Sequence, residues 1–252
     1  MAVRPEKAPV VAFRSAPLST QIVLQVRHAL FEKQLRPGDF VGTEKDLAAR
    51  YGVSRIVARD ALRTLEALGI VEIKVGSGGG ARIAQGNARL FAEALAVQLD
   101  LAGVTTAEIM DAQRAIECLA AELAAENATA DDIAKLRGLL DDAEEKLDDV
   151  DAFTENGRQF HLAVAEASHN RVLVVQLLSL QHVSWPSQNR TLTPKVATHV
   201  LDAHRGLTDL IEIRDAAGAR RLMDDHVKMI RARRVAESRK SSAKERKPID
   251  CC

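Results

Sequence analysis

The chain is poor in aromatic residues and in cysteine, and it lacks long apolar runs. Aromatic residues make up 3% of the 252 positions, and only three cysteines occur, two of them the adjacent Cys251 and Cys252. Three cysteines without a ligand-like spacing exclude a disulfide framework and favour a reducing cytoplasm. The sequence contains no run of 18 apolar residues and no secretory signal, so we expect neither a membrane span nor export.

Net charge is also absent, but the charges are unevenly distributed. Lysine plus arginine balances aspartate plus glutamate at 35 each. Residues 1–87 nevertheless carry an excess of five positive charges, whereas residues 88–235 carry an excess of seven negative charges. A basic segment followed by an acidic one favours a two-domain protein whose first part meets a polyanion such as nucleic acid.

The segment from Ser54 to Gly69 predicts a short helix with two opposed faces. One face is apolar and carries Ala58, Leu62 and Leu65. The other is cationic and carries Arg55, Arg59 and Arg63. Ser54 suits the N-cap and Gly69 the position just past the C-terminus. An arginine face suits the DNA major groove, because guanidinium pairs with guanine and neutralises phosphate. An ordinary amphipathic surface helix is the alternative.

The neighbouring segments complete a winged helix-turn-helix pattern. A shorter helix begins at Thr43, which forms an acidic capping box with Asp46, and a turn containing Gly52 joins it to the arginine helix. An earlier helix is predicted over residues 19–34. After Gly69, two β-branched segments over residues 70–75 and 81–84 flank a glycine-rich turn, which predicts a two-stranded wing. This turn lacks the lysine and the following helix of a nucleotide-binding loop.

The rest of the chain shows a helical period, including predicted helices over residues 129–150 and 153–167. Three histidines lie in apolar helical contexts: His161, His204 and His226. Their separations match no ligand-spacing pattern, so the residues alone favour three unrelated core or boundary histidines over a metal site.

Residues 18–84 resemble the DNA-binding domain of the GntR-type bacterial transcription regulators. The resemblance rests on four ordered segments and the wing: Leu35–Asp39, Thr43–Ala48, Tyr51–Arg55 and Arg59–Leu65. In that family, positions matching Lys45, Arg55 and Arg59 contact the operator, and the wing glycine approaches the minor groove. Together with the arginine spacing, the resemblance implies these DNA-binding residues: Lys45, Ser54, Arg55, Arg59, Arg63, Gly76 and Gly78.

Residues 87–235 resemble the all-helical FCD effector domain of the FadR subfamily. The matching segments are Arg114–Glu117, Phe160-His161, Ala165–Asn170, His204–Asp215 and Met223–His226. In that domain three histidines and an aspartate bind a divalent metal. The resemblance therefore implies a zinc or nickel site made by His161, His204 and His226, although Gly157 stands where the family has the aspartate. Arg114 matches the arginine that meets the effector's carboxylate; a surface ion pair with Glu117 or Asp111 is the alternative.

The chain is thus identified as a mainly α member of the GntR family, FadR subfamily. The expected organisation is a flexible arm over residues 1–17, a winged helix-turn-helix over 18–86, an all-α effector-binding and dimerisation domain over 87–235, and a polar basic tail over 236–252. We expect a cytoplasmic, nucleoid-associated regulator, in the commoner repressor role, that binds a palindromic double-stranded operator as a homodimer and responds to a small carboxylate. The alternatives are a constitutive regulator with a degenerate pocket and a metal-dependent enzyme fused to a DNA-binding domain.

Overall fold

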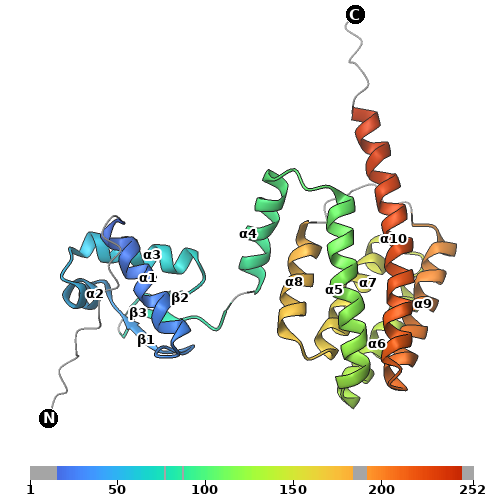
Figure 1. Cartoon of the computed structure of the whole chain (residues 1–252), viewed down its shortest axis with the longest axis horizontal. Coiled ribbons are helices and arrows are strands. Elements are labelled where there is room, and N and C mark those ends of the chain that lie inside the picture. Colours follow the sequence, from blue (N-terminus) through green and yellow to red (C-terminus); the bar gives the residue numbers. More distant parts are fainter. Residues whose placement is uncertain (1–15, 77, 87, 184–191, 246–252) are drawn as a thin grey trace, which may run out of the picture. The chain divides into compact units, whose positions relative to one another are not determined.

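The computed structural model describes residues 16–76, 78–86, 88–183 and 192–245. The chain divides into two compact units, residues 1–87 and residues 88–252, each with its own hydrophobic core (Figure 1). Of the N-terminal arm, residues 1–15 lie outside the described part, as do Cys251 and Cys252 at the other end. Among the described residues, no helix combines the length and apolarity that a membrane crossing requires.

The first unit contains three helices and a small antiparallel sheet. The helices are α1 (Leu18–Phe31), α2 (Glu44–Tyr51) and α3 (Arg55–Ala67), and the strands are β1 (Phe40–Gly42), β2 (Val71–Lys74) and β3 (Gly80–Ile83). The winged helix-turn-helix prediction is confirmed in its class, but the sheet has three strands in the order β1-β3-β2 rather than two. Sequence reasoning missed β1 because three residues are too few to show an alternating pattern; the strand exists through its pairing with β3.

The helix ends of this unit follow local signals in the sequence. Thr43 opens α2 with a capping box, in which its Oγ1 accepts from the Asp46 N–H at 3.3 Å and the Asp46 carboxylate accepts from the Thr43 N–H at 2.8 Å. Ser54 caps α3 by accepting from the Val57 N–H at 3.3 Å. At the other end of α3, Gly69 takes the left-handed conformation at φ 67°. These caps give the arginine helix defined ends.

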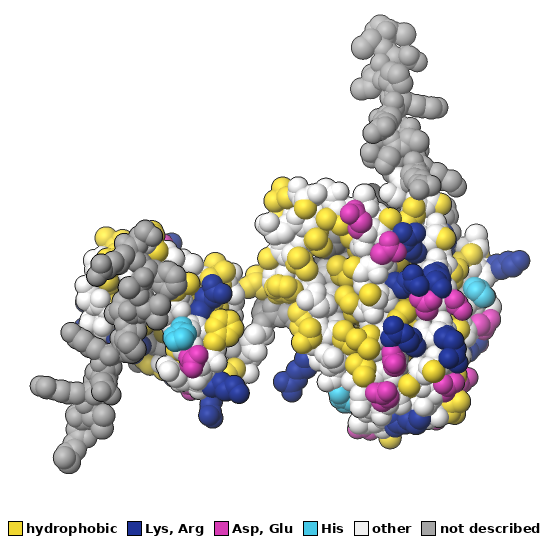
Figure 2. All heavy atoms as spheres, in the orientation of Figure 1, with side chains coloured by type: hydrophobic (Ala, Val, Ile, Leu, Met, Phe, Trp, Pro, Cys, Tyr) yellow, Lys and Arg dark blue, Asp and Glu magenta, His cyan; other side chains and the backbone are white. Residues whose placement is uncertain are grey.

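The second unit is helical throughout its described residues. Its helices are α4 (Ala88–Leu101), α5 (Thr106–Asn127), α6 (Ala130–Glu145), α7 (Val150–Ala167), α8 (Arg171–Val183), α9 (Pro194–Glu212) and α10 (Ala216–Glu245). Helices α5 and α10 lie side by side, and charged side chains of both signs gather over α10 (Figures 1 and 2). Interhelical ion pairs join these two helices: Arg114–Asp224, Arg220–Glu122 and Arg231–Asp111.

Several helix boundaries differ from the prediction. The helix expected over residues 19–34 ends at Phe31. The helix expected to reach residue 150 ends at Glu145, and the next begins at Val150, where the Asp149 carboxylate caps the first turn. The tail expected from residue 236 is still helical through Glu245. Residues with strong helix propensity, such as Ala, Glu, Arg and Lys, propagate a solvated helix without showing an apolar stripe. Hydrophobic periodicity therefore placed this helix end too early.

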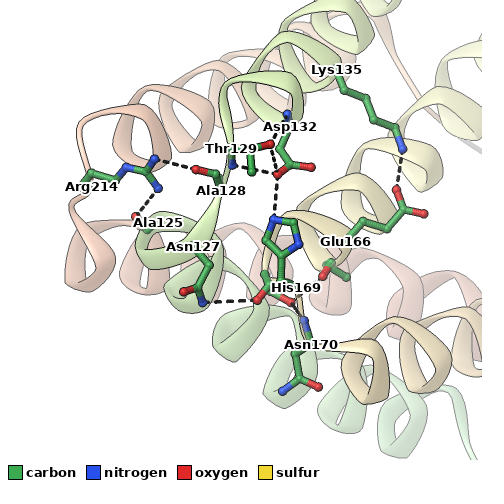
Figure 3. A network of polar contacts seen from close by, with 12 residues as sticks. Ala125, Asn127, Ala128, Thr129, Asp132, Lys135, Glu166, His169, Asn170 and Arg214 are labelled. Carbon is green, nitrogen blue, oxygen red and sulfur yellow. Dashed lines mark hydrogen bonds and ion pairs between the residues drawn. The ribbon is translucent and has the colours of Figure 1, made fainter.

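A polar network fixes one end of the bundle, where α5 and α7 end and α6 begins (Figure 3). Asp132 closes the capping box with Thr129 and lies 3.0 Å from Nε2 of His169. The Arg214 guanidinium donates to the carbonyl oxygens of Ala125 at 3.2 Å and Ala128 at 2.6 Å. Because the last carbonyls of α5 have no partner within the helix, Arg214 satisfies groups that burial would otherwise penalise.

Candidate functional site

Helix α3 presents its arginines to solvent on the face opposite its buried apolar residues. Arg55, Arg59 and Arg63 are all exposed, whereas Ala58, Leu62 and Leu65 are buried in the core of the first unit. Lys45 on α2 is exposed as well. Ile56, which sequence reasoning passed over, is 77% exposed beside Arg55. An exposed apolar side chain among arginines suits contact with a thymine methyl group.

Arg59 has an intramolecular partner that the sequence did not indicate. Its Nε donates to Glu44 Oε1 at 2.7 Å and its second guanidinium nitrogen donates to Glu44 Oε2 at 2.9 Å. The hydrogen bond from Arg59 lowers the pKa of the Glu44 carboxyl. The Glu44 carboxylate thus occupies two guanidinium N–H groups of Arg59 that would otherwise pair with guanine or phosphate.

The wing glycines divide into two structural roles. Gly76 and Gly78, the positions implied by the resemblance, adopt φ of 111° and 78° at the exposed turn between β2 and β3. A Cβ on either would meet no atom within 4 Å, so these positions need glycine for backbone conformation alone. At Gly79, by contrast, a Cβ would lie 2.4 Å from the Lys74 carbonyl oxygen. Close backbone packing inside the turn therefore requires glycine at 79.

The three histidines of the second unit meet inside the bundle. His161 comes from α7, His204 from α9 and His226 from α10, and all three are at least nine-tenths buried. Nε2 of His226 lies 3.2 Å from Nε2 of His204 and 3.3 Å from Nε2 of His161. The Phe160 ring, fully buried, stacks on His204 at a centroid separation of 4.1 Å. Packing thus brings one ring nitrogen of each histidine within 4.8 Å of the others.

The residues present fit a divalent metal of borderline softness. Ligands at the usual zinc–nitrogen distance occupy tetrahedron corners roughly 3.3 Å apart. The two Nε2 separations around His226 match that value. Burial, followed by repulsion from the neighbouring histidines, lowers the pKa of His204 well below its usual range, and the same causes lower the pKa of His226 to about 3. Neutral imidazole is the form that binds a metal.

Glu117 on α5 supports the histidine cluster from behind. Its side chain is 1% exposed, and its Oε2 lies 2.9 Å from Nδ1 of His161. Its other oxygen accepts from Gln113 Nε2 at 2.6 Å. Burial alone would raise the pKa of the Glu117 carboxyl, but His161 and Gln113 more than offset it, so the pKa is lowered. A carboxylate on Nδ1 fixes the ring orientation and leaves Nε2 for the metal. The only sequence signal for this role was a charged residue within an apolar helical stripe.

A cavity of about 120 Å³ adjoins the histidines. His161, His204, Glu117 and Gly157 all belong to its wall. A Cβ added at Gly157 would meet only the Cε1 atom of His204, at an ordinary contact distance of 3.9 Å. The position that the family fills with aspartate is therefore open space on the cavity wall.

Arg114 does not line this cavity. Its guanidinium donates to the Asp224 carboxylate of α10 and holds the pKa of that carboxyl well below its usual range. The ion pair is also not the one considered from the sequence, since Asp111 pairs with Arg231 and Glu117 with His161. Arginine side chains do reach the cavity wall, but they belong to Arg158, Arg233 and Arg234.

Comparisons with known proteins cover both units. Residues 18–80 match the family described as bacterial regulatory proteins, gntR family, and residues 108–229 match the FCD domain. An Escherichia coli protein provisionally assigned to regulation of an L-lactate dehydrogenase operon is 31% identical over 228 residues, covering 84% of each chain. The Uxu operon transcriptional regulator of Escherichia coli is 28% identical over 225 residues, covering 84% of this chain and 85% of that one.

A solved structure shares the fold. The Streptococcus agalactiae GntR structure aligns with a TM-score of 0.58 at 22% identity, covering 85% of this chain and 99% of that one. The matched families and relatives are transcription regulators rather than enzymes, which sets aside the fused-enzyme alternative. With both domain types matched in order and a relative 31% identical over most of both chains, the protein belongs to the GntR family of bacterial transcription regulators, in the FadR-type group that carries an FCD domain.

Proposed function

We propose that this protein is a ligand-responsive repressor that binds a palindromic operator as a homodimer through α3 and the wing. The exposed arginines of α3 support this role, because they can pair with guanine and neutralise phosphate. Arg55 and Arg59 read bases, Lys45 and Arg63 contact phosphates, Ser54 fixes the start of the reading helix, and Gly76 and Gly78 let the wing backbone approach the duplex.

Full-length protein incubated with a random double-stranded DNA pool should enrich an inverted repeat. Two half-sites related by a dyad reflect the two-fold symmetry of a dimeric reader. Enrichment of a single asymmetric site would contradict the homodimeric mode.

The homodimer is proposed to form through the helical unit. Hydrophobic side chains gather over α4 and α8 (Figure 2), and four large ones on these helices are well exposed: Phe91, Val97, Leu101 and Val172. Clusters of exposed apolar side chains of this kind mark association surfaces. Light scattering should give the mass of two chains, and a lysine at Val97 or Leu101 should shift that mass toward one chain.

The response to ligand is proposed to run through a divalent metal, zinc or nickel, held by His161, His204 and His226. The observation that carries this proposal is the convergence of their Nε2 atoms at 3.2 and 3.3 Å on the edge of a cavity. Such a metal would supply a Lewis-acidic position for an oxygen donor of the effector, a small organic acid. Binding there would change the operator affinity of the reading heads, which is a coupling between distinct sites.

Elemental analysis of protein purified without an affinity tag or chelator tests the metal. About one equivalent of zinc or nickel per chain is expected, and the His204→Ala variant should lose it. His199→Ala is the matched control, because His199 is exposed on the same helix. Absence of metal from the wild-type protein, together with operator binding that no organic acid alters, would instead support a constitutive regulator whose pocket has degenerated at Gly157.

A further inference from the structure

Ile56 lies in the first turn of α3 with most of its side chain in water. Helix α3 begins at Arg55, so Ile56 is its second residue, and it is 77% exposed. Within α3, whose residues the structure describes throughout, Ile56 is the one large apolar side chain that is exposed, whereas Leu62 and Leu65 are buried in the core. Isoleucine at position 56 therefore contributes little to the core of the first unit.

Ile56 shares its helix face with two of the arginines that are proposed to meet DNA. It precedes Arg59 by three residues and Arg63 by seven, which are the spacings that place side chains on one face of a helix. Arg59 and Arg63 are both exposed. A duplex that contacts these two arginines therefore covers Ile56 as well, and removing its apolar surface from water stabilises the complex.

The start of α3 is fixed by local contacts, so Ile56 is presented in a defined position. Ser54, two residues before it, caps the helix by accepting from the Val57 N–H at 3.3 Å. Gly52 ends the preceding helix in the left-handed conformation at φ 65°, which keeps the turn between the two helices short. The β-branched side chain of isoleucine has one strongly preferred rotamer in a helix, so it loses little freedom when it meets a partner.

The chemistry of an apolar side chain in the major groove singles out thymine. Only thymine presents a methyl group on its major-groove edge, whereas the polar edges of the other bases would be left unpaired against isoleucine. Side chains three residues apart on a helix have Cβ atoms about 5–6 Å apart, and successive bases of one strand rise by about 3.4 Å. The thymine should therefore lie within about two base pairs of the base that Arg59 contacts.

We propose that Ile56 is a specificity-determining residue, which selects a thymine at one position of each operator half-site by contacting its C5-methyl group. The proposal rests on the proposed function, in which α3 enters the major groove of a palindromic operator. It gives the helix a second kind of base recognition. The arginines recognise hydrogen-bonding groups, and Ile56 recognises a methyl group.

Replacing thymine by uracil removes only the methyl group and tests this contact directly. The probe is the inverted-repeat duplex that the full-length protein enriches from random DNA, with each thymine replaced in turn by uracil in both half-sites. Burial of one methyl group changes affinity about fourfold, so at one thymine position the dissociation constant should rise about 15-fold for the two half-sites together. In Ile56→Ala the thymine and uracil duplexes should bind nearly equally, because the partner of the methyl group is gone. Fluorescence anisotropy measures each dissociation constant.

Leu68→Ala is the matched control, because Leu68 is also exposed, at 55%, but lies at the other end of α3. This variant should keep the full effect of uracil. If no thymine position responds to uracil in the wild-type protein, or if Ile56→Ala responds as strongly as the wild type, the assignment to Ile56 is overturned while the proposed function stands. If the full-length protein enriches no DNA sequence, the proposed function itself fails, and this inference fails with it.

Discussion

Replacing Glu117 by glutamine should weaken metal binding while leaving the metal-free protein folded. The change preserves side-chain volume in a position that is 1% exposed. The new amide can present its oxygen to Nδ1 of His161, and its nitrogen then faces Gln113. The Oε1 atom of Gln113 is buried without a hydrogen-bond partner, so a turn of that amide would accept the new N–H. The substitution thus removes a charge at nearly unchanged side-chain volume.

The size of the effect follows from the type of contact that changes. A hydrogen bond to a charged partner contributes about 1.5–3 kcal/mol and a neutral one about 0.5–1.5 kcal/mol. The difference, roughly 1–1.5 kcal/mol, corresponds to a rise of about tenfold in the metal dissociation constant. This estimate falls at the lower end of the roughly 10- to 100-fold losses seen when the outer partner of a metal-bound histidine is removed.

Competition against a chromophoric chelator measures the dissociation constant, and circular dichroism checks the fold of the metal-free variant. Glu122→Gln is the matched control, because Glu122 is on the same helix but pairs with Arg220 at the surface. A zinc affinity in Glu117→Gln equal to that of the wild type would refute the view that this carboxylate orients His161. An equal loss in Glu122→Gln would point to a general effect of the helix.

Arg59→Ala should weaken binding to the selected operator by about 5- to 150-fold, measured by fluorescence anisotropy. Glu44→Gln should strengthen operator binding by up to about fivefold, because it removes an anion that competes for Arg59. Weaker binding in Glu44→Gln would instead mean that the Glu44 carboxylate positions Arg59 for the operator. Gly157→Asp should tighten zinc binding, because the open space at position 157 accepts a side chain and the new carboxylate adds a fourth ligand to the three histidines. An unchanged zinc affinity in the chelator assay would argue against a metal site at this place. Thr129→Ala should lower the free energy of unfolding by about 1 kcal/mol in urea denaturation, through loss of the α6 cap. The pKa of His226 is lowered to about 3 in the fold and is 6.5 in the unfolded chain, so only the unfolded state takes up this proton between those values. Between pH 7.5 and pH 5 this histidine alone should therefore cost the chelated protein about 2 kcal/mol of stability, in addition to the loss from His204, whose pKa is also lowered. A melting temperature that falls as steeply with pH in His226→Gln as in the wild type would contradict this source.

Much of the fold was predictable because its signals are local. The capping box at Thr43, the caps of α3 at Ser54 and Gly69, and the opposed faces of α3 all depend on residues a few positions apart. The predictions failed where local signals were weak or ambiguous. Strand β1 is three residues long and depends on pairing with β3, and the polar end of α10 has helix propensity but no apolar stripe.

The candidate sites divide in the same way. The sequence by itself determined which residue types were available: the arginine face of α3, and three histidines in apolar helical contexts. Only the tertiary structure decided their partners, because each contact spans a long stretch of chain. Arg59 reaches Glu44 across 15 positions, and Arg114 reaches Asp224 across 110. Whether an arginine faces a ligand or an ion pair depends on which helices pack together, and that packing is set by the burial of apolar surface over the whole chain rather than by any local pattern.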